Sequence, residues 1–433
     1  MSLEIQTTRL TNLSSEQARR LVRRSAVASA QVHRAAQAIC DAVRTGGDEA
    51  LAAAGASFGG GRTDPSVMHA EMKSAWDATN DEIRDAIEES IRNVEFFHSR
   101  QRPTDLTVEP VPGVRIDRKW SALGSVGAYI PGGKAAYPSS LIMTVVPALA
   151  AGVGRIVVAS PAMADGRIDP TLLATAYRLG VTEMYAMGGA QAVAALAYGT
   201  ESIRPVDKIV GPGNAYVTAA KLIVLGVCAI DMPAGPSEVL VIADGSADPE
   251  MVAVDLLCQA EHGPDSPALL VTTDESLARK VGEHINRLLP QLDRREILAQ
   301  ALTRHGLVVL VETISEAVAF ANDYAAEHVT VLTERSAHDA DSITSAGSIY
   351  VGHWSPEAAG DYATGANHVL PTGGLARSMN PLGIEDFGTW RQVQTLTESG
   401  LRAIAPTIST LATAEGLTAH RLSVDVRLRP SVR

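Results

Sequence analysis

The pattern of apolar and polar positions separates a helical N-terminal part from a longer part in which strands and helices alternate. A short strand-like piece comes first, and the Ser14-Ser-Glu-Gln17 pattern, typical of a capping box, predicts a helix to about Arg24. A second helix is expected over 30–57. A third helix, up to Arg102-Pro103, has apolar residues at helical spacing: Ile83, Ile87, Ile91, Val94 and Phe97. We interpret this part as a scaffold or dimer arm.

From Ser125 onward, short apolar segments with strand character alternate with helical segments. Strands are expected at 125–130, 155–160, 182–187, 207–210, 238–243, 268–273, 307–311, 329–333 and 347–351. Helices are expected between them, the first through Ala150 and the others at 169–179, 190–198, 215–225, 248–262, 275–289, 315–327 and 336–345. This alternation predicts an α/β fold with two units in series, each a mostly parallel sheet covered by helices. After Pro381 we expect helices at about 383–399 and 407–416, and then a charged strand-like tail from Arg421 to Arg429.

Length, charge and cysteine content narrow the class of protein. At 433 residues, with 46% hydrophobic and 20% charged residues, the chain is expected to form several globular domains. A net charge of −12 without a Lys/Arg-rich run argues against a nucleic-acid partner and favours small-molecule ligands. The most apolar segment, Leu141 to Gly154, is too short and too broken to cross a bilayer. Three scattered cysteines and an N-terminus without an apolar signal region predict a cytoplasmic protein.

Three junctions between a strand and a helix are rich in glycine: Pro131-Gly-Gly133, Gly188-Gly189 and Gly211-Pro-Gly213. Such junctions present backbone N–H groups at a helix N-terminus, where a pyrophosphate or carboxylate can bind. They are equally typical of ordinary tight turns, and both interpretations stay open. Since none matches the G-x-G-x-x-G pattern, these turns do not indicate a standard Rossmann dinucleotide site.

Gln259 and His262 lie at the end of the helix expected over 248–262, three residues apart and therefore on one side of it. An amide oxygen and an imidazole side by side could begin a metal site. A histidine at a helix C-terminus also suits the helix dipole, and this simpler interpretation is favoured on these two residues alone. A metal site would need further ligands from distant parts of the chain.

Two later segments carry candidate chemistry. Glu327-His328 is expected to close a helix just before a strand, a position that we interpret as the carboxyl edge of the sheet, where α/β proteins bind ligands. The pair offers a carboxylate and an imidazole that titrates near neutral pH, although such a pair is also common at solvated helix ends. The Gly-rich loop 352–374 carries Asp361 and His368, and its length indicates a functional loop more than a surface Ω-loop.

Glu415 and His420 lie so late in the chain that they would have to fold back or reach a second subunit. Gln259, His262, Asp361 and His420 together would give nitrogen and oxygen donors that suit a zinc or manganese ion.

Long motifs follow one another along the chain: Val126-Gly-Ala-Tyr-Ile-Pro-Gly-Gly133, Gly188-Gly-Ala-Gln-Ala192, Asp207-Lys-Ile-Val-Gly-Pro-Gly-Asn214, Ala234-Gly-Pro-Ser-Glu238, Gln259-Ala-Glu-His-Gly-Pro264, Glu327-His328, Gly360-Asp361-Tyr and Asn367-His-Val-Leu-Pro371. Through these motifs, from about residue 20 to the end, the sequence resembles the histidinol dehydrogenase family. The resemblance implies a zinc-dependent, homodimeric enzyme that oxidises L-histidinol to L-histidine through L-histidinal and uses NAD twice.

The resemblance also implies roles for individual residues. Zinc would be bound by Gln259, His262, Asp361 and His420, the last delivered by the second subunit. NAD would contact Tyr129, Gln191 and Asn214. The substrate would contact Ser237, His328, His368 and Glu415 beside the metal ligands. His328 would remove the hydroxyl proton, and Glu327 would activate the water that adds to the aldehyde.

The family has two incomplete Rossmann-like domains with parallel sheets and small helical extensions at both ends, which agrees with the absence of G-x-G-x-x-G. We therefore expect four parts. They are an N-terminal arm (1–26), a first Rossmann-like domain with the metal and catalytic residues (27–124 with 239–381), an inserted NAD-binding domain (125–238) and a C-terminal domain that reaches the partner subunit (382–433).

One departure from the family pattern concerns the substrate. After Asp386-Phe387 the family usually carries x-Lys-Arg, whereas this chain has Gly388-Thr389-Trp390. The alternative function is therefore a related dehydrogenase that oxidises another primary alcohol, such as a sulfonated diol, with the same metal ligands. Glu415, which binds the substrate in the family, favours histidinol.

Overall fold

The structure is a computed structural model that describes residues 3–25, 29–58, 62–132 and 136–429. Its internal contacts divide the chain into two compact units. Unit 1 comprises Met1–Gln101 with Leu123–Phe387, and unit 2 comprises Arg102–Ala122 with Gly388–Arg433.

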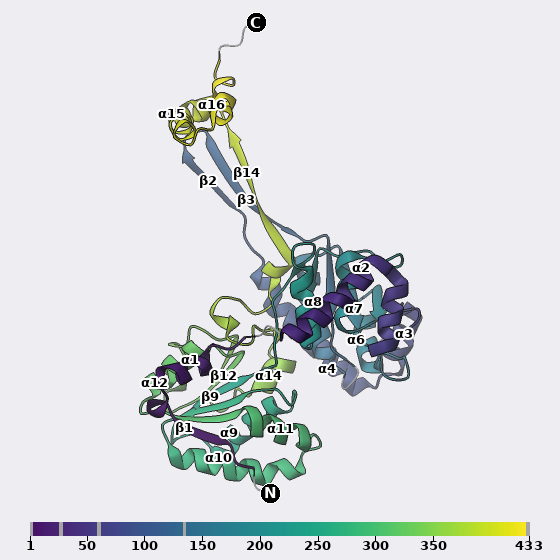
Figure 1. Cartoon of the computed structure of the whole chain (residues 1–433), viewed down its shortest axis with the longest axis vertical. Coiled ribbons are helices and arrows are strands. Elements are labelled where there is room, and N and C mark those ends of the chain that lie inside the picture. The colour runs from purple at the N-terminus through teal and green to yellow at the C-terminus, as the bar shows by residue number, and fades with distance from the viewer. Residues whose placement is uncertain (1–2, 26–28, 59–61, 133–135, 430–433) are drawn as a thin grey trace. The chain divides into compact units, whose positions relative to one another are not determined.

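Sheet A of unit 1 has six parallel strands in the order β1-β11-β10-β9-β12-β13 (Figure 1). The strands are β1 (Gln6–Arg9), β9 (Val239–Ala243), β10 (Ala268–Thr272), β11 (Gly306–Leu310), β12 (His328–Leu332) and β13 (Ser348–Val351). When β9 to β13 are numbered 1 to 5 along the chain, their order across the sheet is 3-2-1-4-5, which is a Rossmann arrangement. The order reverses between β9 and β12.

Both faces of sheet A are buried. Successive residues of β9 point to opposite sides of the sheet, and both sets lie in a core. Val239 and Val241 pack into one core, whereas Leu240 and Ile242 pack into another. The first core contains α9 (Pro249–Ala260), α10 (Glu275–Leu288) and α11 (Arg295–His305). The second contains α12 (Ile314–Tyr324) and α13 (Ser336–Ala340), and α1 (Ser15–Val22) packs against α12.

Sheet B of unit 1 has five parallel strands in the order β6-β5-β4-β7-β8. The strands are β4 (Ser125–Tyr129), β5 (Arg155–Ser160), β6 (Glu183–Ala186), β7 (Lys208–Val210) and β8 (Ala229–Ile230). The helices that connect them are α5 (Pro138–Ala151), α6 (Pro170–Arg178), α7 (Gly189–Tyr198) and α8 (Ala215–Val224). Counted from β4, the strand order is the same as in sheet A, and the order reverses between β4 and β7.

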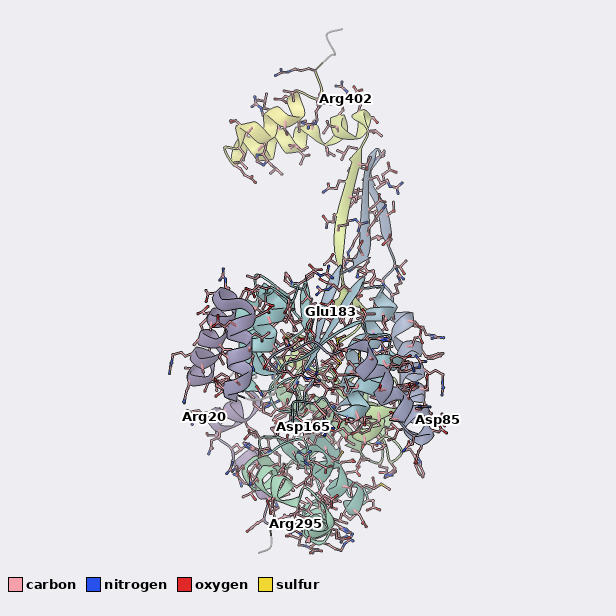
Figure 2. The ribbon with its side chains drawn as sticks, turned by 90° about the vertical axis from the view of Figure 1, so that its right-hand side faces the viewer. Arg20, Asp85, Asp165, Glu183, Arg295 and Arg402 are labelled. Carbon is pink, nitrogen blue, oxygen red and sulfur yellow. The ribbon has the colours of Figure 1, made fainter. Side chains whose placement is uncertain are left out.

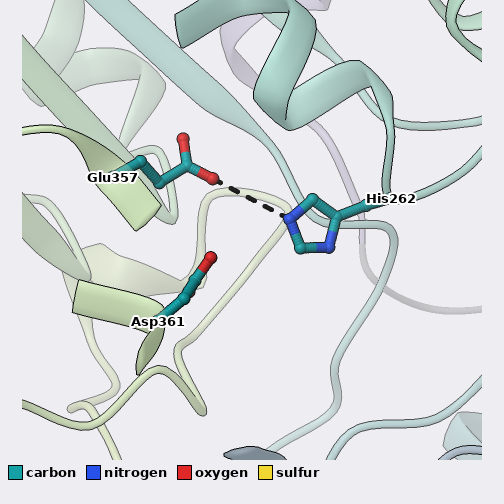
Figure 3. A group of neighbouring side chains, drawn as sticks. All are labelled: His262, Glu357 and Asp361. Carbon is teal, nitrogen blue, oxygen red and sulfur yellow. Dashed lines mark ion pairs between the residues drawn. The ribbon is translucent and has the colours of Figure 1, made fainter. Parts of the chain in front are cut away.

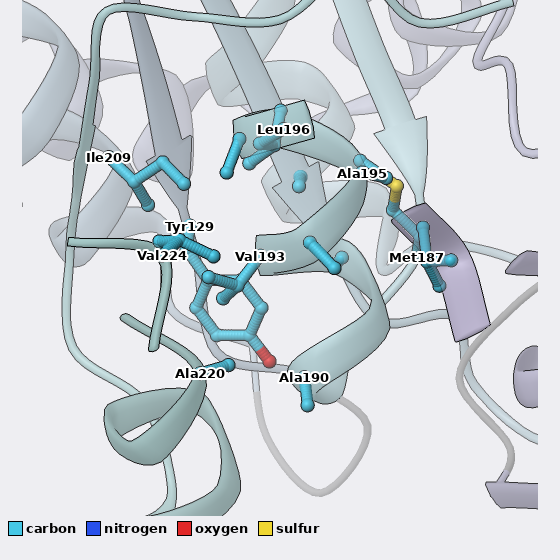
Figure 4. Packing of buried hydrophobic residues seen from close by; sticks show 14 of the residues in the cluster. Tyr129, Met187, Ala190, Val193, Ala195, Leu196, Ile209, Ala220 and Val224 are labelled. Atoms are coloured by element: carbon cyan, nitrogen blue, oxygen red, sulfur yellow. The ribbon is translucent and has the colours of Figure 1, made fainter. Parts of the chain in front are cut away.

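Three N-terminal helices pack on the helices of sheet B: α2 (Ala30–Phe58) on α7 and α8, α3 (His69–Ala78) on α6, and α4 (Asp81–His98) on α5. The core on this side of sheet B contains Tyr129 of β4 and Val193 and Leu196 of α7 (Figure 4). Within α2 the helical geometry is broken at Gly47, whose φ of +51° favours glycine.

Short 3₁₀ turns complete unit 1: η1 (Leu10–Asn12), η2 (Ser99–Gln101), η3 (Leu289–Gln291), η4 (Leu375–Arg377) and η5 (Ile384–Phe387). The loop 352–374 contains a short helix, α14 (Glu357–Tyr362), and most of its residues from Gly365 to Thr372 are buried. The loop is therefore not a surface Ω-loop.

Unit 2 is an antiparallel sheet of three strands followed by two helices. Its elements are β2 (Leu106–Val111), β3 (Val114–Ala122), β14 (Gly388–Leu396), α15 (Glu398–Ala414) and α16 (Thr418–Asp425). Charged side chains of both signs lie exposed on both units, including Arg20, Asp85 and Asp165 in unit 1 and Arg402 in unit 2 (Figure 2).

The predicted α/β fold with parallel sheets is confirmed, and every strand predicted between 125 and 351 is present. Two expectations for the C-terminal part were wrong, whereas the helix predicted at 407–416 lies largely within α15. The segment predicted as a helix over 383–399 is mostly strand β14, and the tail predicted as a strand from Arg421 is helix α16 as far as Asp425. Most side chains of both elements are exposed, so burial leaves little pattern in their sequence.

Six helices and strands were not predicted at all: β2, β3, β8, α3, α11 and α14. The four-part domain division stays a prediction. Two observations speak against its boundary at 124: α2 to α4 pack on sheet B helices, and β2 and β3 share a compact unit with the C-terminal segment. Among the described residues, none of the helices combines the length and apolar character that crossing a membrane requires.

Candidate functional site

Glu327 and His328 lie at the amino edge of sheet A. Helix α12 ends at Tyr324, and Ala325 takes a left-handed conformation with φ of +51°. The chain then enters β12, of which His328 is the first residue. The prediction that this pair closes a helix was wrong, because the helix ends three residues earlier than its sequence pattern indicated. The predicted carboxyl edge was also wrong, because residues at the beginning of a strand lie at its amino end.

The end of α9 also lies at this edge, because the helix runs back from the carboxyl end of β9. Gln259 is in the last helical turn and is fully buried. The helix ends at Ala260, so His262 lies just beyond it and not in its last turn as predicted. Its backbone N–H donates to the carbonyl oxygen of Gln259 (3.2 Å), which keeps the two residues together.

Helix α14 adds two carboxylates to the site. Glu357 and Asp361 are four residues apart, and ligand atoms of His262, Glu357 and Asp361 all lie within 4.8 Å of one another (Figure 3). His262 Nε2 is 3.9 Å from Glu357 Oε1. Glu357 was not predicted as a site residue, because residues 352–374 were expected to form a loop. The Pro-Glu-x-x-x-Asp spacing from Pro356 to Asp361, typical of a short helix, could have indicated it.

Two further histidines approach these acids. His328 Nδ1 lies 3.6 Å from Glu357 Oε1 and 3.9 Å from Glu327 Oε2. His368 Nδ1 lies 3.0 Å from the backbone oxygen of Asp361, and its Nε2 lies 3.2 Å from Ser140 Oγ. Since both ring nitrogens of His368 have partners within the chain, its first effect is to hold the Asp361 segment.

The residues Gln259, His328 and Glu357 are each at most 2% exposed. None of their side-chain nitrogen or oxygen atoms has a hydrogen-bond partner within the described part of the chain. Buried polar groups are almost always paired, so six unpaired atoms in one region are typical of a site that binds a polar ligand or an ion. Amide oxygen, imidazole and carboxylate are donors that a zinc ion accepts.

Burial disfavours the charged forms of these groups. Desolvation raises the pKa of Glu327 and of Glu357 well above 4.5, and raises the pKa of Asp361 to about 6. The same effect lowers the pKa of His328 to about 3 and that of His368 to about 4. A bound cation would favour the ionised carboxylates, so the acids and the ion stabilise each other.

Glu327 is held from the segment before β9. Its Oε2 accepts a hydrogen bond from the backbone N–H of Glu238 (3.0 Å). A hydrogen bond with Ser237 also opposes the rise in the pKa of Glu327. The predicted substrate residue Ser237, which is half-buried, is therefore brought to the same site.

The predicted NAD residues lie at the carboxyl edge of sheet B. Tyr129 ends β4 and is buried, and its hydroxyl accepts a hydrogen bond from the N–H of Gly189 (3.1 Å). Gln191 is buried in the first turn of α7. Asn214 caps α8, accepting from two backbone N–H groups. All three belong to the edge where doubly wound sheets bind dinucleotides.

The glycines of this edge are required by packing. A Cβ at Gly188 would collide with Pro161, and one at Gly211, whose φ is +109°, would collide with the backbone oxygen of Tyr129. Buried Lys221 and Asp231 fix Gly211 further, since Lys221 Nζ donates to its carbonyl oxygen (3.0 Å) and Asp231 Oδ2 accepts from its N–H (2.8 Å). These collisions support the tight-turn interpretation at Gly188 and Gly211. Gly133 lies outside the described residues.

Two predicted residues belong to unit 2. Glu415 caps the end of α15, and His420 lies in α16; both are exposed. Unit 1 alone thus brings together Gln259, His262, Asp361, Glu327 and His328, with Ser237 and His368 beside them.

Two sheets of Rossmann order, one with a buried cluster of acids and imidazoles, are typical of α/β dehydrogenases. The family model described as histidinol dehydrogenase matches residues 22–428. The histidinol dehydrogenase of Salmonella typhimurium is 46% identical over 422 residues, which cover 96% of each chain. That of Methanothermobacter thermautotrophicus is 46% identical over 392 residues, 90% of this chain and 92% of the relative.

A solved structure agrees with the sequence comparisons. The crystal structure of histidinol dehydrogenase from Elizabethkingia anophelis matches 99% of both chains with a TM-score of 0.92 and 39% identity. The chain belongs to the histidinol dehydrogenase family, which confirms the resemblance and the prediction of an NAD-dependent oxidoreductase.

Proposed function

We propose that this chain oxidises L-histidinol to L-histidine through L-histidinal, in histidine biosynthesis. Each turnover would use two molecules of NAD⁺, and each subunit would hold one zinc ion. The observation that carries the proposal is the buried acid and imidazole cluster at the amino edge of sheet A, in a chain that matches the family from residue 22 to 428. The balanced reaction consumes one alcohol, one water and two NAD⁺, and yields one carboxylate, two NADH and three protons.

The residues present fit a zinc ion. Gln259, His262 and Asp361 would hold it from unit 1, and His420 of a second subunit would complete the four ligands. The unpaired amide of Gln259 supports this assignment, since a buried amide oxygen without a donor is free to bind a cation. Zinc, when bound, supplies a Lewis-acidic anchor for the nitrogens of the substrate.

His328 and Glu327 would handle the protons. In the first step the alcohol carbon gives its hydride to NAD⁺ while His328 takes the hydroxyl proton. In the second step Glu327 takes a proton from a water whose oxygen bonds to the aldehyde carbon. The resulting hydrate anion gives a second hydride to NAD⁺ and becomes the carboxylic acid, which ionises. Separate environments suit separate roles: His328 has unpaired ring nitrogens, whereas Glu327 is fixed by the N–H of Glu238.

We also propose that NAD binds at the carboxyl edge of sheet B, next to Tyr129, Gln191 and Asn214. The N-termini of α7 and α8 both lie at this edge. Helix α7 has no side-chain cap, so its first turn suits a pyrophosphate, whereas the first N–H groups of α8 are already engaged by Asn214. NAD supplies the hydride acceptor. Tyr129 would act through the turn that it holds, since its hydroxyl is engaged by Gly189.

A homodimer is supported by the composition of unit 2. Its helices leave Leu411, Leu417, Leu422 and Val426 exposed by 41–57%, and the buried apolar side chains of α15 and α16 are Ala412 and Val424. A unit with so small a core gains stability by covering these side chains with a second copy of the chain. A cytoplasmic location is supported by three free cysteines.

The substrate is tested by a panel of primary alcohols with NAD and zinc. Histidinol should give two NADH for each molecule consumed. Turnover of a sulfonated diol without turnover of histidinol would favour the alternative dehydrogenase.

Trp390 stands where the family usually carries a basic residue. Within unit 2, the guanidinium of Arg118 lies over its ring, with Cζ 3.7 Å from the ring centroid.

The shared metal site is tested by mixing two inactive proteins, His262→Asn and His420→Asn. Hybrid dimers contain one site with all four ligands, so activity should return to about a quarter of the wild-type value or less. Mixing either variant with itself is the control. No recovery in mixtures that demonstrably exchange subunits would contradict a site built from two chains.

A further inference from the structure

An arginine from the N-terminal segment reaches the residue that holds Glu327. Arg24 donates to Glu238 through Nε (3.0 Å to Oε2) and Nη2 (2.6 Å to Oε1), which is a bidentate ion pair. The carboxylate of Glu238 is 2% exposed and the arginine side chain 17%. Such a pair is shielded from water, so its geometry is well defined.

The guanidinium of Arg24 is fixed by a second residue as well. It lies over the ring of Tyr324, 3.2 Å from the centroid, and its Nη1 donates to the backbone oxygen of Tyr324 (2.9 Å). Tyr324 is the last residue of α12, three positions before Glu327. Arg24 therefore ties together the end of α12 and the segment before β9.

Glu238 connects this arginine to the proposed catalytic pair. Its backbone N–H donates to Glu327 Oε2 (3.0 Å), and its backbone oxygen accepts from the N–H of His328 (3.2 Å). Its carboxylate also accepts from the N–H of Gly373 (3.0 Å). The side chain of Glu238 is thus anchored on one side, while its backbone orients Glu327 on the other.

We propose that Arg24 is a positioning residue for Glu327, acting through Glu238. This inference rests on the proposed role of Glu327 in the oxidation of the aldehyde. Without the bidentate anchor, residue 238 can shift, and the carboxylate of Glu327 loses its fixed N–H donor. A lysine at position 24 would keep the charge but make a single contact, so it should position Glu238 less well.

The competing explanation is that Arg24 only fastens the N-terminal segment to unit 1. That role predicts a lower melting temperature and unchanged kinetics in the folded protein. The positioning role predicts a loss confined mainly to the step that uses Glu327, because a small displacement of a catalytic group lowers kcat strongly.

The test measures the two halves of the reaction separately, with the zinc-loaded full chain. L-Histidinal is oxidised with NAD⁺ in one assay and reduced with NADH in the other. Arg24→Met should lower kcat for oxidation by about tenfold to a hundredfold, with KM and zinc content unchanged, and should change reduction by less than about threefold. Arg24→Lys should lie between Arg24→Met and the wild type, and it carries the test if Arg24→Met does not fold.

Arg23→Met is the matched control, since Arg23 is the exposed neighbour of Arg24 and should leave both rates unchanged. Unchanged kcat in Arg24→Met, or equal losses in both assays together with loss of zinc, would overturn the proposal. Glu327→Gln separates the two ideas. If that variant oxidises L-histidinal normally, the role of Glu327 and the Arg24 proposal both fall. If it is impaired while Arg24→Met is not, only the Arg24 proposal falls.

Discussion

Sheets A and B share one strand order, yet their candidate sites lie at opposite edges. In sheet B the predicted NAD residues lie at the end of β4 and after β6 and β7, at the carboxyl edge. In sheet A the proposed catalytic residues lie at the beginning of β12, and the proposed metal ligand His262 lies beyond the end of α9, at the amino edge. The position of a candidate site in these sheets therefore depends more on the side chains at each edge than on the order of the strands.

The two edges offer different chemistry. The carboxyl edge of sheet B presents helix N-termini and glycine turns, which bind through backbone N–H groups. The amino edge of sheet A presents acids, an amide and imidazoles that are buried and largely unpaired. At the amino edge of sheet B the charged side chains are paired with each other: Arg155 and Glu183 form a bidentate ion pair (2.6 and 2.7 Å).

The largest expected effect concerns the amino edge of sheet A. His328→Ala should lower kcat with histidinol by about a thousandfold, because the variant lacks the base that takes the hydroxyl proton. NAD affinity and zinc content should stay unchanged. Steady-state NADH formation, zinc analysis and NAD titration check this. His338→Ala, which removes an exposed histidine, is the control. A rate near wild type would remove His328 from the mechanism.

A second substitution addresses the carboxyl edge of sheet B. Gly211→Ala combines an unfavourable φ of +109° with a collision against Tyr129 O, whereas Gly226→Ala has a similar φ of +114° and nothing within 4 Å. We expect the free energy of unfolding to fall by about 2 kcal/mol more in Gly211→Ala than in Gly226→Ala. NAD affinity should fall only in Gly211→Ala, with zinc affinity unchanged in both. Equal NAD binding in the two variants would argue against a cofactor site at this turn.

The third substitution asks whether the unpaired amide of sheet A binds metal. Gln259→Leu removes two buried polar atoms without partners. The metal-free variant should therefore be at least as stable to heat as the metal-free wild type, because the desolvated amide no longer has to be accommodated. Zinc affinity should fall by about tenfold or more. Unchanged zinc affinity would exclude Gln259 as a ligand.

The smallest effect is expected at the amino edge of sheet B. Arg155 lowers the pKa of Glu183 below 4.5, so the pair stabilises the folded state above that pH, and this stability is lost as the pH falls through the lowered pKa. Glu183→Gln should cost about 1 kcal/mol at pH 7 and leave kcat unchanged. The difference from wild type in urea unfolding should shrink below pH 4.5. A loss of activity would indicate that this edge also takes part in the chemistry.

The fold could be predicted wherever burial shapes the sequence. Central strands such as β9 and β12 are buried on both faces and appear as continuous apolar runs. Strand β14 lies in a thin antiparallel sheet with most residues exposed, so its sequence carries no such run. The end of α12 could not be predicted, because the helix stops before an alanine in a left-handed conformation that its sequence does not demand. The amino edge of the sheet, in contrast, follows from the place of Glu327 directly before a strand.

The site was predictable to the extent that motifs fix it. Gln259, His262 and Asp361 were all indicated, and unit 1 brings their segments together. Glu357 was not predicted as a site residue, because α14 has only six residues and includes Gly360, so its sequence shows little helical periodicity. The contact of Arg24 was not predicted either, because its partner Glu238 is more than two hundred positions away and no local sequence pattern indicates such a contact.

The unpaired atoms of Gln259, His328 and Glu357 have a consequence for the amount of folded protein in a cell. Each buried polar group without a partner destabilises the metal-free chain by about 1–3 kcal/mol. A ligand that satisfies these groups binds the folded state alone, and at a hundredfold excess over its Kd it adds about 2.7 kcal/mol to the free energy of unfolding. If the proposed zinc ion is that ligand, its scarcity would lower both the lifetime and the activity of the protein, so supply of the ion would set abundance and activity together.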